Sequence, residues 1–366
     1  MRNENVSTDS TSPNSLSPTL SQGEREIAGL ALPGLADSDL ICAVDVGGTN
    51  LRAANIDRGG RIHERVRTAT PGSKPAEEVV SAIAATVREC ESGGAKRGAH
   101  IGGISVVVPG SVQVETGVVV NAPNLPSLQG YELAPALETA LERPVLLEND
   151  ANAAALGEMW QGSARGYQTI ICLTLGTGVG GGIILDGKLW RGADGTAGEI
   201  GHTTVEPFGV IKCKCGNTGC LEVYASATAI VRMAREASTR HPSHLLHSIA
   251  ADDLTSERIC SAASAGDELA LDVFRRVGVY LGIAMANLVN IFNPEMIVIG
   301  GGVSAAWELF AQHARAEVLK RAFPVPAQRC RIVRAECGGD AGLLGAAHLA
   351  FANDSGQKPS TKKRVY

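Results

Sequence analysis

The chain has 366 residues, of which 44% are hydrophobic and 19% are charged, enough for about two domains with packed cores. A net charge of -5 excludes a general electrostatic attraction to nucleic acid or to an anionic membrane, so an anionic ligand must be held by local groups. The nine cysteines form no disulfide framework, and the first residues contain no apolar signal segment. These features predict a cytoplasmic protein that binds neither nucleic acid nor membrane.

Both ends of the chain are polar. Residues 1–38 are rich in Ser, Thr, Pro and Asn and lack apolar periodicity, and residues 353–366 are polar and lysine-bearing. Such segments cannot bury enough apolar surface to order themselves, so we expect two disordered or flexible tails. One short helical run, QGEREIAGL, stands out in the first tail, which has too few helices for a winged helix-turn-helix module.

Between the tails, strand-like apolar runs alternate with helical patterns. The predicted strands are ICAVDV, LRAANID, IGGISVVV, RPVLLEN, TIICLTL, GGIILDG, MIVIGGG and CRIVRAE. AEEVVSAIAATVREC and the run from Asp267 to Asn293 have helical periodicity. This alternation predicts an α/β architecture with covered sheets.

A weak internal repeat divides this folded part. ICAVDVGGTNLRAANID and TIICLTLGTGVGGGIILDG each contain an apolar strand, a glycine-rich turn, a second apolar strand and an acidic turn. Two copies separated by about a domain length indicate a duplicated α/β unit, with one glycine hairpin from each copy facing a shared cleft.

The glycine turns are candidates for holding phosphates. Glycine lets consecutive backbone N–H groups point inward, and a third turn follows the buried run MIVIG and precedes a helix expected near Ser304. Simple tight β-turns remain the alternative for each hairpin. The predicted nucleotide contacts are Asp45, Gly47, Gly48, Thr49, Asn50, Arg52, Gly176, Thr177, Gly178, Gly300, Gly301 and Gly302.

Two aspartates are the candidates for chemistry in this cleft. Asp45 in the first hairpin could hold Mg²⁺ directly or through water, or it could cap a turn. Asp150 follows the strand RPVLLEN at the start of a helix, where it could accept the proton of a substrate hydroxyl that attacks a phosphoryl group. Helix N-capping by Asn149 or Asp150 is the alternative.

Several other polar residues could bind a polyol, because amide and carboxylate groups can bridge two neighbouring hydroxyls. Gly110 and Asn124 lie in a Pro-punctuated loop after the strand ISVVV, where Asn124 could also be a turn residue. The predicted polyol-binding side chains are Asn124, Asn149, Asp150, Glu199, His202 and Glu222.

A cysteine-rich run predicts a metal site. Cys213, Cys215 and Cys220 have C-x-C-x4-C spacing around glycines, and His202 lies upstream as a fourth donor. Four protein donors leave no open coordination position, so the zinc would be structural and would fix the loops of Glu199 and Glu222. Three buried thiols beside a surface histidine are the alternative.

The motifs together resemble those of the ROK family of sugar kinases and sugar-responsive repressors. The resemblance covers about residues 40–352 and is carried by DVGGTNLR, NAPNL, ENDANAAALGE, LGTGVGGGI, GEIGH, CKCGNTGCLE, IGGGVS and DAGLLGAA. It implies an actin-like ATPase fold of the hexokinase and ribonuclease H-like type. We place one α/β domain at 39–162, closed by a helix at 340–352, and a larger one with the zinc loop at 163–339.

The resemblance also implies roles for individual residues. Asp150 would be the catalytic base, with Gly110, Asn124, Asn149, Glu199, His202 and Glu222 around the sugar, and His202, Cys213, Cys215 and Cys220 would be the zinc ligands. His202 would present one nitrogen to the metal and the other to the sugar. Ser127, Leu128 and Gln129 replace an aromatic residue that is frequent in the family a few positions after Asn124.

We therefore predict an ATP- and Mg²⁺-dependent glucokinase that phosphorylates the 6-hydroxyl of glucose, in a homodimer or homotetramer. A kinase for another hexose, with N-acetylmannosamine as the main rival, and a non-catalytic sugar-sensing repressor are the alternatives. Polyphosphate is an open alternative to ATP as the phosphoryl donor.

Overall fold

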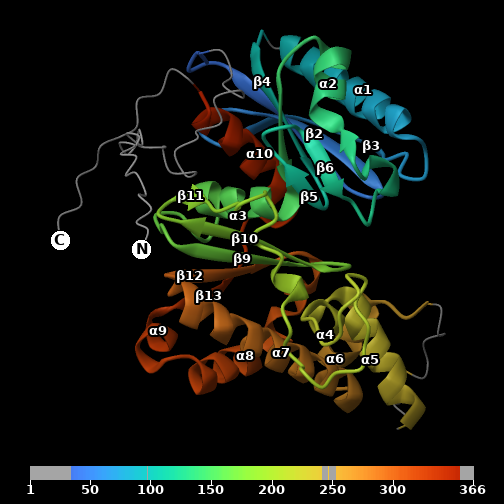
Figure 1. Cartoon of the computed structure of the whole chain (residues 1–366), viewed down its shortest axis with the longest axis vertical. Coiled ribbons are helices and arrows are strands. Elements are labelled where there is room, and N and C mark those ends of the chain that lie inside the picture. The colour runs from blue at the N-terminus through green and yellow to red at the C-terminus, as the bar shows by residue number, and fades with distance from the viewer. Residues whose placement is uncertain (1–33, 97, 241–245, 247–252, 355–366) are drawn as a thin grey trace, which may run out of the picture.

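Two five-stranded sheets with the same strand order form the frame of the protein (Figure 1). The computed structural model describes residues 34–96, 98–240, 246 and 253–354. The expected C-terminal tail, apart from Asn353 and Asp354, and the helical run QGEREIAGL lie outside these ranges. Residues 34–38, which we placed in the first tail, are described, and the backbone N–H of Leu35 donates to Asp354 Oδ1 at 3.0 Å.

The first sheet has the order β3-β2-β1-β4-β8. The bounds of its strands are β1 Leu40–Val46, β2 Asn50–Ile56, β3 Ile62–Ala69, β4 Ile101–Val108 and β8 Val145–Asn149. β2 runs antiparallel to both β1 and β3, whereas β4 is parallel to β1 and to β8. A small antiparallel sheet of β5 (Ser111–Gln113), β6 (Val118–Asn121) and β7 (Tyr131–Glu132) follows β4 in the chain.

The second sheet repeats this topology in the order β11-β10-β9-β12-β13. Its strands are β9 Ile170–Leu175, β10 Val179–Leu185, β11 Lys188–Leu189, β12 Met296–Gly300 and β13 Arg331–Arg334. β10 is antiparallel to β9 and β11, and β12 is parallel to β9 and β13. The expected duplication is therefore confirmed at the level of strand order and direction.

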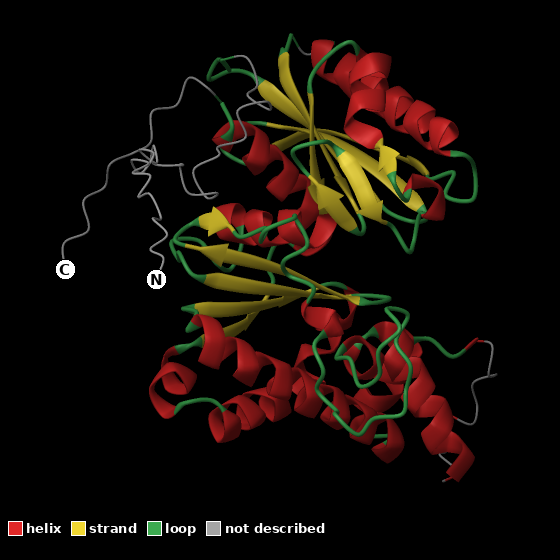
Figure 2. Cartoon of the chain, in the orientation of Figure 1, coloured by secondary structure: helices red, strands yellow, loops and turns green. Residues whose placement is uncertain are grey.

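The helices cover both faces of both sheets (Figure 2). Their bounds are α1 Ala76–Ala95, α2 Leu133–Leu141, α3 Asp150–Gln161, α4 Glu222–Ala225, α5 Ala227–Arg240, α6 Ser256–Ser264, α7 Glu268–Phe292, α8 Trp307–Arg321, α9 Pro324–Arg329 and α10 Ala341–Ala352. α1 and α2 pack on the outer face of the first sheet, and α4 to α9 lie beyond the second sheet (Figure 1). A 3₁₀ turn at Gly302–Ala306 precedes α8, so the helix expected near Ser304 begins as an α-helix only at Trp307.

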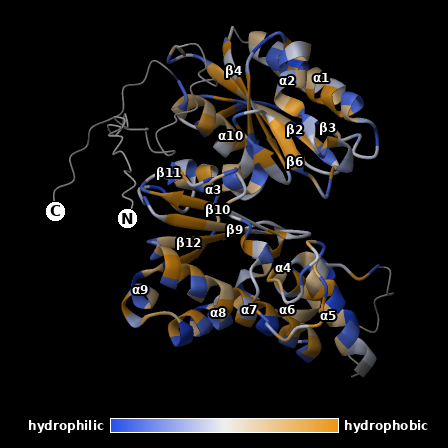
Figure 3. Cartoon of the chain, in the orientation of Figure 1, coloured by the Kyte–Doolittle hydropathy of each residue, from blue (hydrophilic) through white to orange (hydrophobic). Residues whose placement is uncertain are grey.

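The central layer consists of α3 and α10, which lie between the two sheets (Figure 1). One buried cluster joins Ile41 and Ala43 of the first sheet, Ile170 and Cys172 of the second, and apolar residues of both helices. The central strands of both sheets are strongly apolar (Figure 3) because helices cover both of their faces. No helix among the described residues is long and apolar enough to cross a membrane.

α3 and α10 approach each other closely at two glycines. A Cβ atom at Gly345 of α10 would overlap the backbone carbonyl of Ala153 in α3, and one at Gly157 of α3 would overlap that of Ala341 in α10. Because the obstacle is backbone in both cases, the helices would have to separate to accommodate any side chain.

We predict that Gly345→Ala lowers the free energy of unfolding by roughly 3 kcal/mol, because overpacking outweighs the gain in helix propensity. Gly93→Ala in α1 is the matched control, since the three atoms nearest to its Cβ belong to the side chain of Glu64 and not to the backbone. Denaturant unfolding measures both variants. Equal stability of Gly345→Ala and the parent chain would contradict the close contact.

Candidate functional site

Two cavities lie in the cleft between the sheets and share a wall. The first, of about 390 Å³, is lined by residues that include Gly110, Asn124, Glu199, His202 and Glu222. The second, of about 310 Å³, is lined by Asp45, Arg52, Gly300 and Gly339 among others. The residues common to both are Asp150, Ala151, Thr174 and Gly301. Asp150 therefore lies where the two cavities meet.

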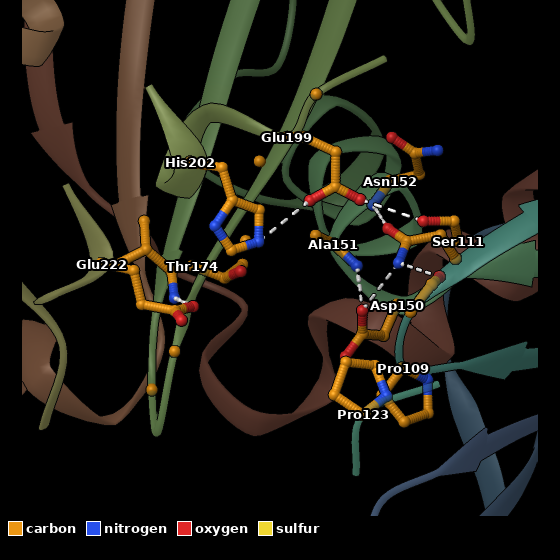
Figure 4. A pocket seen from close by; sticks show the side chains of 18 of the residues that line it. Pro109, Ser111, Pro123, Asp150, Ala151, Asn152, Thr174, Glu199, His202 and Glu222 are labelled. Atoms are coloured by element: carbon orange, nitrogen blue, oxygen red, sulfur yellow. Dashed lines mark hydrogen bonds and ion pairs between the residues drawn. The ribbon is translucent and has the colours of Figure 1, made fainter. Parts of the chain in front are cut away.

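The start of α3 holds Asp150 by neutral donors. Its Oδ1 accepts hydrogen bonds from the N–H of Ala151 at 2.8 Å and from Nδ2 of Asn149 at 3.0 Å (Figure 4). Burial and, to a smaller extent, the charge of Asp45 raise the pKa of Asp150 to about 7. A carboxyl group with such a pKa can exchange a proton near neutral pH.

Asn149, not Asp150, caps the helix. The Asn149 side chain accepts a hydrogen bond from the N–H of Asn152 at 2.9 Å, and its Nδ2 also donates to the carbonyl of Gly110 at 2.8 Å. The capping alternative therefore applies to Asn149 alone, and Asp150 remains available to the cavities. That Asn149 orients a substrate hydroxyl stays a prediction, because these contacts engage both its oxygen and its nitrogen.

Three predicted polyol ligands form one wall of the first cavity (Figure 4). Glu199 Oε1 accepts a hydrogen bond from Ser111 Oγ at 3.1 Å, and Glu199 Oε2 lies 3.8 Å from Nε2 of His202. Glu222 Oε2 accepts from the N–H of Val179 at 3.1 Å. No sequence pattern singled out Ser111, although it directly follows Gly110.

The four predicted metal ligands come together at His202, which also belongs to this wall. Their donor atoms all lie within 4.8 Å of one another, with 3.7 Å between the sulfurs of Cys215 and Cys220 and 3.4 Å between Cys213 Sγ and His202 Nδ1. Tetrahedral zinc with metal–sulfur bonds of about 2.3 Å requires sulfur–sulfur distances of about 3.8 Å, which the Cys215–Cys220 pair matches. His202 thus turns Nδ1 to the thiols and Nε2 to Glu199.

The predicted nucleotide contacts are distributed unevenly. Gly176, Thr177 and Gly178 line the first cavity, Asp45, Arg52 and Gly300 line the second, and Gly301 lines both, whereas Gly47, Gly48, Thr49, Asn50 and Gly302 line neither. Arg52 pairs with Asp45 Oδ2 and donates to the carbonyl of Gly339 at 2.7 Å. Gly338 and Gly339, just before α10, form part of the second cavity and were missed in the sequence.

Comparison with known proteins places the chain in a family. A family model described as the ROK family matches residues 41–353. The chain is 40% identical over 312 residues to the glucokinase of Halalkalibacterium halodurans, an alignment that covers 84% of this chain and 93% of that protein. It is also 38% identical over 252 residues to the xylose repressor of Caldicellulosiruptor bescii, covering 69% of this chain and 63% of the repressor.

A solved structure supports the same assignment. The ROK family glucokinase from Streptomyces griseus, in complex with glucose and AMPPNP, is 38% identical and superposes with a TM-score of 0.73 over 86% of this chain and 99% of that one. The expected actin-like, two-sheet fold is thereby confirmed. The chain belongs to the ROK family.

Proposed function

We propose that the protein is an ATP-dependent hexose kinase that transfers the γ-phosphoryl group to the 6-hydroxyl of glucose. The observation that carries this proposal is the position of Asp150, at the junction of a cavity rich in polyol ligands and a cavity lined by glycine turns. A hydroxyl in the first cavity and a phosphoryl group entering from the second would meet at this carboxylate. The glucokinase relatives support glucose as the acceptor.

The first cavity suits a small polyol. Asn124, Glu199, His202 and Glu222 present amide, carboxylate and imidazole groups to a space of about 390 Å³. Each carboxylate can accept hydrogen bonds from two neighbouring hydroxyls, so this set can fix both the position and the rotation of a sugar ring. A fixed ring aligns one hydroxyl with the phosphoryl donor.

Asp150 would act as the general base of the transfer. Its ionised form accepts the proton of the hydroxyl as the oxygen attacks the terminal phosphorus and ADP leaves. Backbone N–H groups of Thr177 and Gly178, which line the first cavity, would bind oxygens of the phosphoryl group where it reaches Asp150, since the N–H of Gly176 already donates to the carbonyl of Gly178. Mg²⁺, when bound, would offset phosphate charge, and Asp45 is the residue in this chain that would hold it. Arg52 already pairs with Oδ2 of Asp45, so Oδ1 or a water molecule would make the contact with the metal.

Zinc in the thiol cluster would have a structural role. The donor set of three cysteines and one histidine, at the spacing described above, favours zinc over harder cations. Glu222 follows Cys220 by two residues, and Glu199 precedes His202 by three, so a fixed cluster also fixes both carboxylates.

Two alternatives remain. A kinase for N-acetylmannosamine would use the same base, and the ratio of kcat/KM for glucose and N-acetylmannosamine separates the two. The repressor relative favours a sugar sensor as the second candidate. A sensor would bind sugar without releasing ADP and would retard DNA in a gel-shift assay in a salt-dependent manner.

A homodimer or homotetramer is also part of the proposal, and a measurement of molecular size in solution tests it.

Replacing the base tests the proposal directly. Asp150→Asn keeps the acceptors for Ala151 N–H and Asn149 Nδ2 but removes the proton acceptor, so we expect kcat to fall about 10²–10⁴-fold. A coupled ADP-release assay with ATP, Mg²⁺ and a panel of hexoses measures this, and calorimetry should find glucose affinity within a few-fold of the parent. Near-normal turnover would remove Asp150 from the mechanism.

The raised pKa of Asp150 predicts an acid limb in the pH profile. The group is a base only when ionised, so kcat/KM for glucose should fall tenfold per pH unit below about 7.

The fold raises the pKa of Asp150 from its ordinary value of 3.8, so the ionised carboxylate lowers the free energy of unfolding increasingly from about pH 4 to about pH 7. The stability of Asp150→Asn relative to the parent should therefore be higher at pH 8 than at pH 4. A pH-independent difference would mean that the pKa is not raised.

Removing one thiol tests the metal site. We expect Cys215→Ser to lose zinc and to weaken glucose binding by roughly tenfold or more, because the loops of Glu199 and Glu222 lose their anchor. Elemental analysis and calorimetry provide the two readouts. Cys260→Ser, in α6 and outside the cluster, is the matched control. Unchanged affinity in a zinc-free variant would refute the coupling between metal and sugar.

A further inference from the structure

A buried carboxylate lies next to the proposed base but lines neither cavity. Glu148, near the end of β8 and two residues before Asp150, has only 1% of its surface exposed. Burial of a carboxylate is costly unless its oxygens are hydrogen-bonded and its charge is paired. The groups that satisfy Glu148 therefore indicate what it holds together.

The two oxygens of Glu148 bind two different parts of the chain. Oε1 accepts hydrogen bonds from the N–H of Asn149 and from Nδ2 of Asn152, both at 2.9 Å, in the first turn of α3. Oε2 accepts a hydrogen bond from Nε of Arg191 at 2.8 Å, and Nη2 of the same guanidinium lies 2.8 Å from this oxygen in an ion pair. Arg191 follows β11 in the second half of the fold. One carboxylate thus connects the helix start that carries Asp150 with a segment 43 residues further along the chain.

Arg191 begins the segment that leads to the sugar ligands. Its carbonyl accepts a hydrogen bond from the N–H of Ala197 at 3.0 Å, which closes a loop. Gly195, Ala197, Gly198 and Glu199 in and after this loop line the first cavity, whereas Arg191 does not. Arg191 is thus placed to affect a ligand through the loop and not by touching it.

Stability alone does not account for this ion pair. A buried ion pair recovers little more than its desolvation cost, and an apolar pair of similar size would stabilise the fold as well. What an arginine provides instead is a planar set of donors that fixes the angle and distance of its partner. Here that geometry connects the base with the wall of the acceptor cavity.

We propose that Arg191 is a positioning residue of the acceptor site. Through Glu148 it holds the loop 191–199 against the first turn of α3, so that Glu199 and Asp150 keep a fixed separation while a sugar binds. The kinetic consequence of this inference rests on the proposed function. The contact of Arg191 with Glu148, which we call the clamp, is a property of the ligand-free protein.

Arg191→Lys tests the clamp with the charge retained. Lysine is a point donor without the fork, so the loop should loosen while the fold survives. We expect the Ala197 amide to exchange hydrogen several-fold faster, the KM and the calorimetric Kd for glucose to rise roughly tenfold, and the KM for ATP to change less than twofold. Glu148→Gln, which keeps the shape and loses the charge, should show the same pattern.

Arg143→Lys is the matched control. Like Arg191, Arg143 makes two contacts: an ion pair with Glu91 and a hydrogen bond to the backbone carbonyl of Ile101. Arg143 lines neither cavity of the cleft. Its substitution should leave the Kd for glucose unchanged. Thermal unfolding of all three variants identifies any general loss of stability.

A double-mutant cycle with Glu199→Gln separates positioning from a general structural effect. If Arg191 acts through Glu199, Arg191→Lys should weaken glucose binding much less in the Glu199→Gln background than in the parent. Additive losses, or unchanged exchange at Ala197, would overturn the inference. If the parent binds glucose but releases no ADP, the kinase proposal fails, while the exchange and affinity measurements still decide the clamp.

Discussion

The crossing of α3 and α10 controls the distance between the two sheets. α3 packs on β9 and β10, α10 packs on β1 and β4, and the two helices meet backbone to backbone at Gly157 and Gly345. A helix pair in such close contact cannot slide or separate without losing dense packing. The first residue of α3 is Asp150, so the same contact that spaces the sheets also places the proposed base in the cleft between them.

The carboxylates in and beside this cleft have two kinds of partner. Asp45 pairs with Arg52, and Glu148 pairs with Arg191, so both carboxylates face a guanidinium. Asp150 instead receives hydrogen bonds from neutral groups, and burial raises its pKa to about 7. A carboxylate with an elevated pKa can take up and return a proton. The neutral donors around Asp150 therefore distinguish it from the two carboxylates that pair with a guanidinium.

Two groups of contacts lie beside the wall of the first cavity. The thiol cluster includes His202 itself and ends two residues before Glu222, and the Glu148–Arg191 pair restrains the loop that leads to Glu199. Side chains held by such outer contacts lose little further freedom when a ligand binds, which favours affinity. The same contacts would serve a kinase and a sugar sensor, and both kinds of protein occur among the relatives. Catalysis would differ from sensing at Asp150 and the phosphate side of the cleft.

The sequence alone predicted the strands of the two main sheets other than β3 and β11, the helices α1 and α7, the duplication and the four-residue Cys/His cluster, because alternation, helical periodicity and short ligand spacings are local properties. It also singled out Asp150 but could not distinguish it from Asn149 as the helix cap. Only the tertiary structure decided that Asn149 caps α3, that Ser111 reaches Glu199, and that Arg191 pairs with Glu148. It also decided that Gly47 to Asn50 lie outside both cavities. Such contacts join residues far apart in the chain, and their geometry follows from how the layers pack rather than from any local pattern.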